Sequence, residues 1–301
     1  MRMAIALLLI LPAFGEPPAD DFRISTDVYN VVLDVGVRNS KGRYVSGLPA
    51  EDFRVEDIGV PQKITSFSDG DVPVTVGLVM DDSGSMRPKR ADVITAGLAF
   101  AGASNPKDEI FVVNFNDSVH FGLPPSLPFS DNIKTLAAAL AKDQPAGRTA
   151  LYAAIAHALQ HLEMGTRDRK TLVAISDGGD NASAEKLSEI VHMIEESHAT
   201  IYTIGLFDAD DSDRNPRVLQ RLASISGGEA FLPAKLDDVI PLCRKVAGDI
   251  RHRYTIGYVP SGNGSKEGRH TLRVTVSDPR YGHLTVQTRT SYITPPAVLD
   301  P

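Results

Sequence analysis

Cysteine is nearly absent from this sequence: Cys243 is the only one in 301 residues. One thiol cannot form a disulfide within the chain, so a disulfide framework is excluded and a packed core must stabilise the fold. Cys243 lies in a segment with the periodicity of an amphipathic helix. We therefore expect it to be a small buried side chain rather than a reactive thiol.

Tryptophan and excess positive charge are also missing. The chain has no Trp, which excludes a Trp-based platform for sugars or cations, and its formal net charge is −7. Neutralising phosphates requires a basic surface, so we expect no nucleic-acid partner. A hydrophobic fraction of 42% with 23% charged residues is typical of a globular chain, long enough for one large domain and a smaller one.

The apolar run at the N-terminus is too short to span a membrane. Arg2 precedes an apolar stretch from Ala4 to Leu11, and Pro12 follows. A span needs about 20 apolar residues, so this layout predicts a secretory signal peptide over residues 1–16 rather than an uncleaved anchor. We expect a secreted or periplasmic protein, bacterial in its cysteine-poor composition, with no membrane span after cleavage.

The pattern of apolar residues changes twice along the chain. Residues 20–70 alternate as β-strands do, residues 72–250 alternate between strand-like and helix-like segments, and β alternation returns over 253–294 before a short tail, 295–301. The fold class predicted is α/β, with a doubly wound, mostly parallel sheet inserted into a β-sandwich that the two terminal segments form. The alternative is two separate small β units.

Two local features follow from turn and capping residues. We expect a turn at residues 59–61, between short strands over 52–56 and 63–67. Asp131 is expected to cap a helix that continues through Lys142.

One stretch, Val74–Met86, combines a buried strand with a loop rich in oxygen donors. Its apolar, β-branched first half is followed by side-chain oxygens at alternating positions, Asp81, Ser83 and Ser85. One carboxylate and two hydroxyls are hard donors, which suit Mg²⁺ or Mn²⁺ rather than zinc.

Two later loops add donors of the same kind. Asp177 follows another predicted strand, and Thr149 immediately precedes a predicted helix. Ligands of an open parallel sheet bind beyond the carboxyl ends of its strands, where these loops are expected to meet. Taken singly, Asp81 and Asp177 could be strand-end turn residues, and Ser83 or Thr149 a helix cap.

Three motifs in these loops resemble the metal-ion-dependent adhesion site (MIDAS) of von Willebrand factor A (VWFA) domains. The D-x-S-x-S signature is Asp81–Ser85, a G-G-T-A-L-Y-like motif is Gly147–Tyr152 with Arg148 in place of the second glycine, and a D-G-x-D-N pattern lies within Ser176–Asn181. The resemblance covers roughly residues 72–250 and implies the Rossmann-like VWFA fold.

The resemblance also implies a ligand set and a function. Ser83 and Ser85 would coordinate the cation directly, Thr149 would join in some states, and Asp81 and Asp177 would act partly through water. Such domains leave a coordination position open for a partner's acidic side chain. The expected function is therefore non-enzymatic, Mg²⁺- or Mn²⁺-dependent binding of a protein or peptide carboxylate, as in cell adhesion or another protein–protein interaction.

The flanking segments carry a narrower resemblance. Residues 32–67, together with Ser226–Gly228 and Tyr254–Tyr258, look like a group of secreted VWFA-related proteins known mainly from Acidobacteria. This likeness implies the architecture and export, not a partner.

Enzyme motifs are lacking. The sequence has no G-x-S-x-G, no G-x-x-x-x-G-K-[ST] and no H-E-x-x-H. His157 and His161 are four apart, but without a third ligand a surface or packing role is expected. The acidic segment Asp208–Asp213 lacks the glycine and the bidentate acid of an EF-hand loop. The alternative functions are a structural or assembly component of an envelope complex and, less favoured, a metal-dependent hydrolase.

Two further acids, Asp82 and Asp180, adjoin the candidate ligands. They are expected either to support cation binding from the second shell or to be solvated loop residues.

Overall fold

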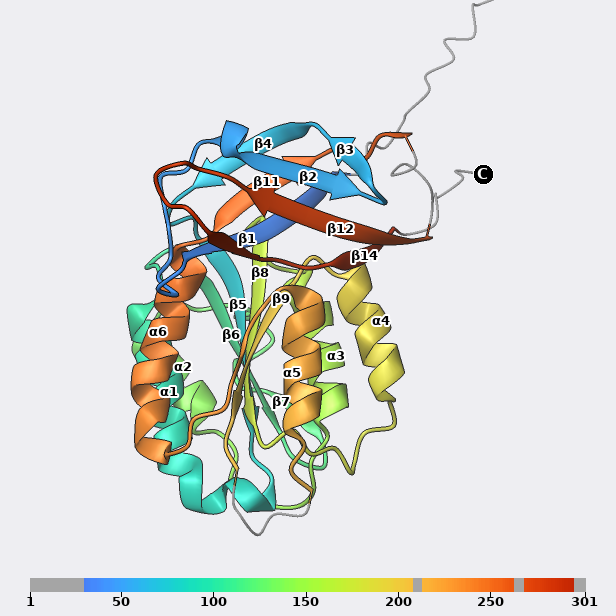
Figure 1. The fold of residues 1–301 in the computed structure, drawn as a ribbon. Coiled ribbons are helices and arrows are strands. Elements are labelled where there is room, and N and C mark those ends of the chain that lie inside the picture. Colours follow the sequence, from blue (N-terminus) through green and yellow to red (C-terminus); the bar gives the residue numbers. More distant parts are fainter. Residues whose placement is uncertain (1–29, 208–212, 263–267, 295–301) are drawn as a thin grey trace, which may run out of the picture.

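The chain folds into an α/β unit and a unit of two β-sheets, which lies above it in Figure 1. The computed structural model describes residues 30–207, 213–262 and 268–294. The predicted signal peptide over residues 1–16 and the tail over 295–301 lie outside the described residues.

The α/β unit is built on a six-stranded sheet with β5 (Val74–Asp81) near its centre. Every residue of β5 is buried, because the strand lies between two neighbours and both of its faces are covered by helices. The sheet order is β10 (Ala230–Phe231), β9 (Thr200–Gly205), β8 (Arg169–Ser176), β5, β6 (Glu109–Phe115) and β7 (Val119–Phe121). All pairings are parallel except that of β7 with β6, so the predicted α/β class with a mostly parallel sheet is confirmed.

Helices cover both faces of this sheet (Figure 1). On one face lie α1 (Arg90–Ala103), α2 (Ile133–Leu140) and α6 (Val239–Arg251); on the other lie α3 (Leu151–Leu162), α4 (Leu187–Glu196) and α5 (Pro216–Ser226). Short 3-10 turns over Gly84–Lys89 and Leu236–Asp238 precede α1 and α6. The described helices include none whose length and hydropathy would let it cross a membrane. Cys243 is buried on α6, as expected.

Two local expectations are wrong. The turn predicted at residues 59–61 lies one residue earlier, because Ile58 adopts a positive φ of 48° and Val60–Gln62 form strand β3. Helix α2 is capped by Asn132 rather than Asp131, since the Asn132 side chain accepts hydrogen bonds from the first backbone N–H groups. This helix also ends two residues before the predicted Lys142.

The β unit combines strands from both ends of the described chain. One sheet has the order β13 (Leu284–Gln287), β1 (Val31–Asn39), β11 (Tyr254–Tyr258) and β4 (Ile64–Asp69). The other has the order β14 (Ser291–Thr294), β12 (Gly268–Val276), β2 (Phe53–Asp57) and β3. Strand β1 pairs antiparallel with β11 and β13, and β2 pairs with β12. The inward side chains of both sheets form one apolar cluster.

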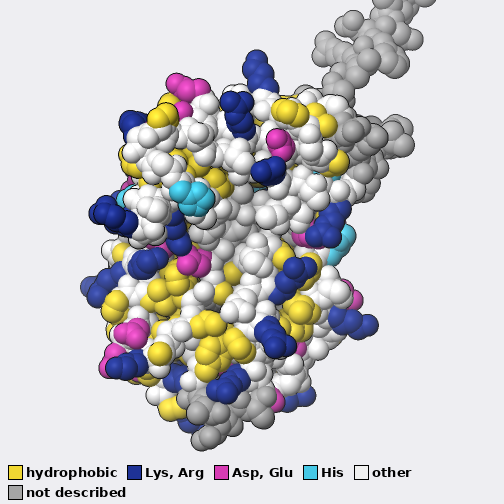
Figure 2. Space-filling view, viewed as in Figure 1, with side chains coloured by type: hydrophobic (Ala, Val, Ile, Leu, Met, Phe, Trp, Pro, Cys, Tyr) yellow, Lys and Arg dark blue, Asp and Glu magenta, His cyan; other side chains and the backbone are white. Residues whose placement is uncertain are grey.

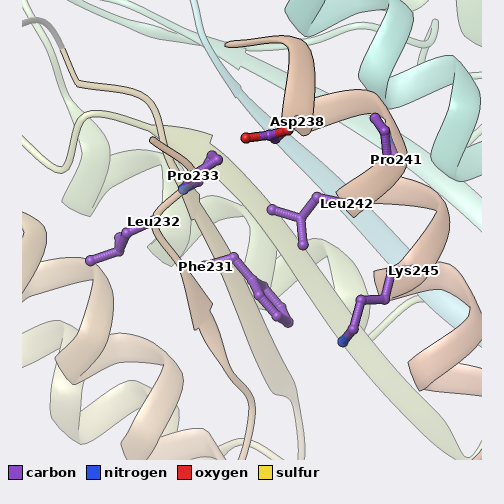
Figure 3. A pocket seen from close by; sticks show the side chains of 7 residues that line it. All are labelled: Phe231, Leu232, Pro233, Asp238, Pro241, Leu242 and Lys245. Atoms are coloured by element: carbon purple, nitrogen blue, oxygen red, sulfur yellow. The ribbon is translucent and has the colours of Figure 1, made fainter. Parts of the chain in front are cut away.

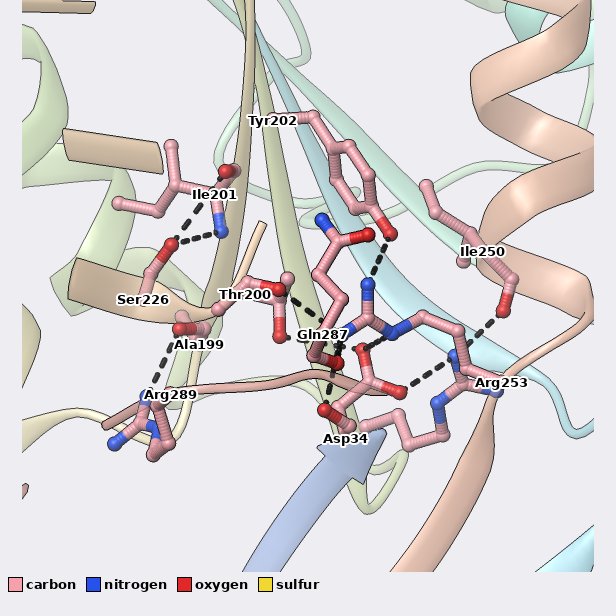
Figure 4. Close-up of polar contacts among 12 residues, drawn as sticks. Asp34, Ala199, Thr200, Ile201, Tyr202, Ser226, Ile250, Arg253, Gln287 and Arg289 are labelled. Carbon is pink, nitrogen blue, oxygen red and sulfur yellow. Dashed lines mark hydrogen bonds and ion pairs between the residues drawn. The ribbon is translucent and has the colours of Figure 1, made fainter. Parts of the chain in front are cut away.

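A buried arginine, Arg253, joins the two units (Figure 4). Its side chain is fully buried, and its Nε lies 3.1 Å from an Asp34 carboxylate oxygen. Nη1 donates to the Tyr202 hydroxyl at 2.9 Å, and Nη2 donates to the carbonyl oxygens of Asp34, Gly227 and Gln287 at 2.9–3.0 Å. The cost of burying this charge is thus offset by one ion pair and by hydrogen bonds to four oxygen atoms.

Further polar contacts join the units at other points of the same boundary. Arg169 on β8 lies 3.0 Å from the other oxygen of the Asp34 carboxylate. At the end of α4, Arg289 donates to the Ala199 carbonyl at 3.0 Å (Figure 4), and Arg269 lies 2.7 Å from Glu195. The β unit is therefore attached to the base of the α/β sheet over a broad area.

Lys and Arg side chains are spread over the face shown in Figure 2, where they alternate with apolar and acidic side chains. No continuous basic patch is visible on this face, in keeping with the net charge of −7.

His198, between α4 and β9, makes stability depend on pH. Burial, together with the nearby charges of Arg289 and Lys170, lowers its pKa to about 4. The unfolded imidazole has a pKa of about 6.5, so the unfolded state binds the extra proton first as the pH falls. The free energy of unfolding should be unaffected by His198 above about pH 6.5. Below that, protonation of His198 should lower it progressively, by up to about 3 kcal/mol near pH 4.

Urea unfolding of wild type and His198→Gln at about pH 7 and about pH 4.5 measures this contribution. The variant should lose less stability between the two values. The control is His192→Gln, at an exposed position on the preceding helix, α4. Equal losses in wild type and His198→Gln would contradict the prediction.

Candidate metal centre

The candidate site begins where β5 ends, at Asp81. This carboxylate is fully buried, and both of its oxygens are hydrogen-bonded. Oδ1 accepts from the Ser83 backbone N–H at 2.9 Å, and Oδ2 accepts from the Ser176 hydroxyl at 2.6 Å. Ser176 ends the neighbouring strand β8, so the parallel pairing of the two strands brings these side chains together.

The side chains of Ser83, Ser85 and Asp177 meet beside Asp81. The Ser83 and Ser85 hydroxyl oxygens are 3.1 Å apart, and the Ser85 hydroxyl donates to Asp177 Oδ2 at 2.8 Å. These contacts join two loops that are 92 residues apart in the sequence. Four of the five predicted ligand residues are therefore connected through direct contacts.

Backbone geometry holds Asp177 in this position. Its Oδ1 accepts from the Gly179 N–H at 2.9 Å, while its carbonyl oxygen accepts from the Asn215 N–H at 2.9 Å. Gly178 has a φ of +80°, and a Cβ there would lie 2.4 Å from the Asn215 carbonyl oxygen. The glycine of the D-G motif is therefore required by both its conformation and its close packing.

Thr149, the fifth predicted residue, is placed through its backbone. Its N–H donates to the Asn181 side chain at 2.9 Å, and its carbonyl oxygen accepts from the Asn181 N–H at 2.9 Å. The loop before it contacts the first loop, because the Gly84 N–H donates to the Gly147 carbonyl oxygen at 3.1 Å. Thr149 is thus fixed between the other two loops.

The donor set carries two buried negative charges. Asp81 is fully buried and Asp177 is 2% exposed. Burial raises the pKa of Asp81 to about 6, and the charge of Asp177 contributes to the increase. A divalent cation between the two carboxylates would remove this repulsion, and an all-oxygen set suits Mg²⁺ or Mn²⁺. The residues present therefore fit such an ion.

This donor set differs from the usual acid- or histidine-rich metal site. In the part of the chain that the structure describes, no group of three or more His, Cys, Asp or Glu side chains is placed to hold a metal. The predicted set contains two acids, Asp81 and Asp177, and its other members are hydroxyls.

The two neighbouring acids have structural roles. Asp82 is buried and forms an ion pair with Arg90, so its interpretation as a solvated loop residue is wrong. Burial raises the pKa of Asp82 to about 7, although the Arg90 charge opposes the increase. The Asp180 carboxylate accepts from the Tyr152 N–H at 2.8 Å and so caps the N-terminus of α3 from another loop.

Ser176 and Asn181 position the site, but the motifs alone did not assign them these roles. Ser176 immediately precedes the D-G-x-D-N pattern, and Asn181 is its last residue. The register between β5 and β8, which pairs Met80 with Ile175, would have placed Ser176 beside Asp81.

The remaining sequence candidates lie elsewhere. His161 packs among aromatic rings, with Phe111 at 4.4 Å between ring centroids, and contacts the Pro128 carbonyl oxygen at 3.0 Å. His157 is exposed. Residues 208–212 of the acidic segment lie outside the described residues.

A separate groove of about 440 Å³ lies between β10 and α6 (Figure 3). Phe231 and Leu242 line it, and the Lys245 ammonium lies 5.0 Å from the centre of the Phe231 ring. None of the five predicted ligand residues is among its lining residues. The groove is mainly apolar and offers a different chemistry from that of the metal centre.

Comparison with known proteins supports a von Willebrand factor type A fold for the α/β unit. A family model described as von Willebrand factor type A domain matches residues 76–179, a range that includes all five predicted ligands. A search of curated proteins gave no match.

Solved structures give the same fold at low identity. A von Willebrand factor type A structure from Catenulispora acidiphila is 15% identical, covers 80% of this chain and 73% of its own, and has a TM-score of 0.53. The vWF domain of the type V pili tip protein Mfa5 from Porphyromonas gingivalis is 15% identical, covers 60% and 95%, and has a TM-score of 0.51. Proximal thread matrix protein 1 from the mussel byssus is 13% identical, covers 64% and 50%, and has a TM-score of 0.53.

Proposed function

We propose that this protein, whose α/β unit contains a von Willebrand factor type A domain, binds a protein or peptide carboxylate through a divalent cation at an intact MIDAS. Asp81, Ser83, Ser85, Thr149 and Asp177 would hold Mg²⁺ or Mn²⁺. The function is adhesion or another protein–protein interaction, and the protein is not an enzyme.

One observation carries this proposal. Ser85 donates its hydroxyl hydrogen to Asp177, and its oxygen lies 3.1 Å from that of Ser83, beside the buried Asp81 carboxylate. Hydroxyls and carboxylates from separate loops thus meet at the carboxyl end of β5, where α/β sheets bind ligands. Such a cluster has more acceptors than donors, which favours a cation.

When bound, the cation would supply a coordination position for a ligand carboxylate. The protein's own contribution is orientation. Ser176 and the Ser83 N–H hold the Asp81 carboxylate, and Asn181 holds the Thr149 backbone. Because these groups are fixed by the ends of buried strands and by α3, little ordering is needed on binding.

The proposed setting is outside the cytoplasm. The predicted signal peptide over residues 1–16 supports secretion or a periplasmic location, and one structure of similar fold is the vWF domain of a pilus tip protein. We also propose that the two β-sheets form a sandwich into which the type A domain is inserted. The pairing of β1 with β11 and of β2 with β12 supports this proposal, as does the shared apolar cluster.

A capped peptide with one Asp, compared with its Asn counterpart, tests the function. We expect the Asp peptide to bind the full chain in Mg²⁺ and to be released by EDTA, whereas the Asn peptide should not bind, because a neutral amide is a poorer ligand for a hard cation. Ligand-observed NMR measures both. Binding that EDTA leaves unchanged would contradict the proposal and favour metal-independent docking in an envelope assembly.

A further inference from the structure

Arg148 occupies an exceptional place beside the candidate metal centre. It immediately precedes Thr149, and it stands where the motif that this loop resembles has glycine. Its side chain is 66% exposed. A long, exposed cationic side chain thus directly precedes a predicted metal ligand.

The guanidinium is held in a defined direction. The Arg148 N–H and Nε donate to the two oxygens of the Asp117 carboxylate at 3.1 Å and 3.0 Å, and Nη1 reaches the Asn181 carbonyl oxygen at 3.4 Å. Asn181 also holds Thr149. The two residues thus contact different atoms of Asn181: Arg148 contacts its backbone carbonyl oxygen, and the Thr149 N–H contacts its side chain.

Gly147 makes this arrangement possible. It has a φ of +73°, and a Cβ there would lie 1.7 Å from an Asp117 carboxylate oxygen. Any side chain at position 147 would therefore displace the acid that orients Arg148. Gly147 and Arg148 thus both pack against Asp117, which lies in the loop between β6 and β7.

Stability does not account for this ion pair. Asp117 is 46% exposed, and exposed ion pairs contribute little to folding. Among the residues that the structure describes, none hydrogen-bonds to Nη2 of Arg148. The outer part of the guanidinium is therefore accessible to a ligand and is oriented in advance.

We propose that Arg148 binds a second carboxylate of the ligand, so that the site selects acidic segments with two neighbouring carboxylates. This inference rests on the proposed function, in which the first carboxylate binds at the metal centre. Arginine suits the role because its planar fork matches a carboxylate. Asp117 contacts only the Nε side of the guanidinium and so positions the side chain.

Two capped peptides test the selection: one contains a single Asp between glycines, and the other contains Asp followed by Glu. In Mg²⁺ the wild type should bind the two-carboxylate peptide roughly tenfold more tightly, because a charged hydrogen bond is added. Arg148→Ala should remove this preference while leaving Mg²⁺ affinity unchanged by calorimetry. Arg148→Lys should retain part of it, because the charge remains and the fork does not.

Arg87→Ala is the matched control. Arg87 is an exposed arginine of the first loop and donates to the Pro145 carbonyl oxygen at 3.2 Å. It changes the net charge equally but should preserve the preference. Equal wild-type affinity for the two peptides would overturn the proposed role of Arg148. So would an Arg148→Ala variant that weakens binding of both peptides equally. Neither result would overturn the proposed function. Failure of both peptides to bind the wild type in Mg²⁺ would overturn the proposed function as well.

Discussion

Replacing Arg253 with methionine is expected to lower the free energy of unfolding by about 3–5 kcal/mol. Methionine fills much of the same space but removes every donor of the guanidinium. The Tyr202 hydroxyl and the carbonyl oxygens of Gly227 and Gln287 would then lose a buried partner. Asp34 would keep Arg169 as a buried cationic partner. The loss is large relative to a total stability of about 5–15 kcal/mol.

Urea unfolding, followed by circular dichroism, measures the effect. Arg253→Lys should be intermediate, because it keeps the charge but not the planar set of donors. Arg273→Ala, at an exposed position on β12, is the control and should change stability by less than about 0.5 kcal/mol. If Arg253→Met unfolds like the control, the guanidinium does not secure the boundary between the units.

This boundary could not be predicted from the sequence. The environment of Arg253 is built from β1, β9, the end of α5 and the end of β13, which are distant in the sequence. A local pattern shows only a basic residue before an apolar strand. The sequence predicts which segments form β-strands. It does not predict the residues that stabilise a buried arginine, because those residues are brought together only in the folded structure.

The residues of the candidate metal centre were easier to predict from the sequence than the contacts of Arg253 between the two units. Asp81 follows an apolar run long enough to identify a buried strand, and parallel strands bring their carboxyl ends to one edge of a sheet. Order along the chain and motif spacing therefore identified the loops. The roles of Ser176, Asn181 and Asp180 were not identified, because each depends on strand register or on a cap supplied by another loop.

The predicted helix start and turn position were each wrong by one residue, at places where neighbouring residues have similar capping or turn propensity. Asp131 and Asn132 are both good helix caps, and the structure uses the second. Near residue 59, Ile58 takes the left-handed conformation together with Gly59, which shifts the turn and lets Val60 pair with Asp57. The position of this turn is thus tied to the pairing of β2 with β3.

Replacing Asp81 with asparagine is expected to abolish stabilisation by Mg²⁺. A ligand present at about 100 times its Kd stabilises the native state by about 2.7 kcal/mol, so a wild-type chain that binds Mg²⁺ should unfold at a higher temperature in the presence of the ion. Asparagine can still accept from the Ser83 N–H, and the Ser176 hydroxyl can accept from its amide. The variant should therefore fold, but it lacks a charge that attracts the cation.

Calorimetric titration with Mg²⁺ and thermal unfolding with and without EDTA measure the two effects. We expect at least about a hundredfold loss of Mg²⁺ affinity and no loss of stability in EDTA, because the substitution relieves repulsion between two buried carboxylates. Asp131→Asn, which removes an exposed acid of the same unit, should behave like wild type. If Asp81→Asn keeps both Mg²⁺ affinity and Mg²⁺-dependent peptide binding, the cation is held elsewhere and the loop after β5 is not its site.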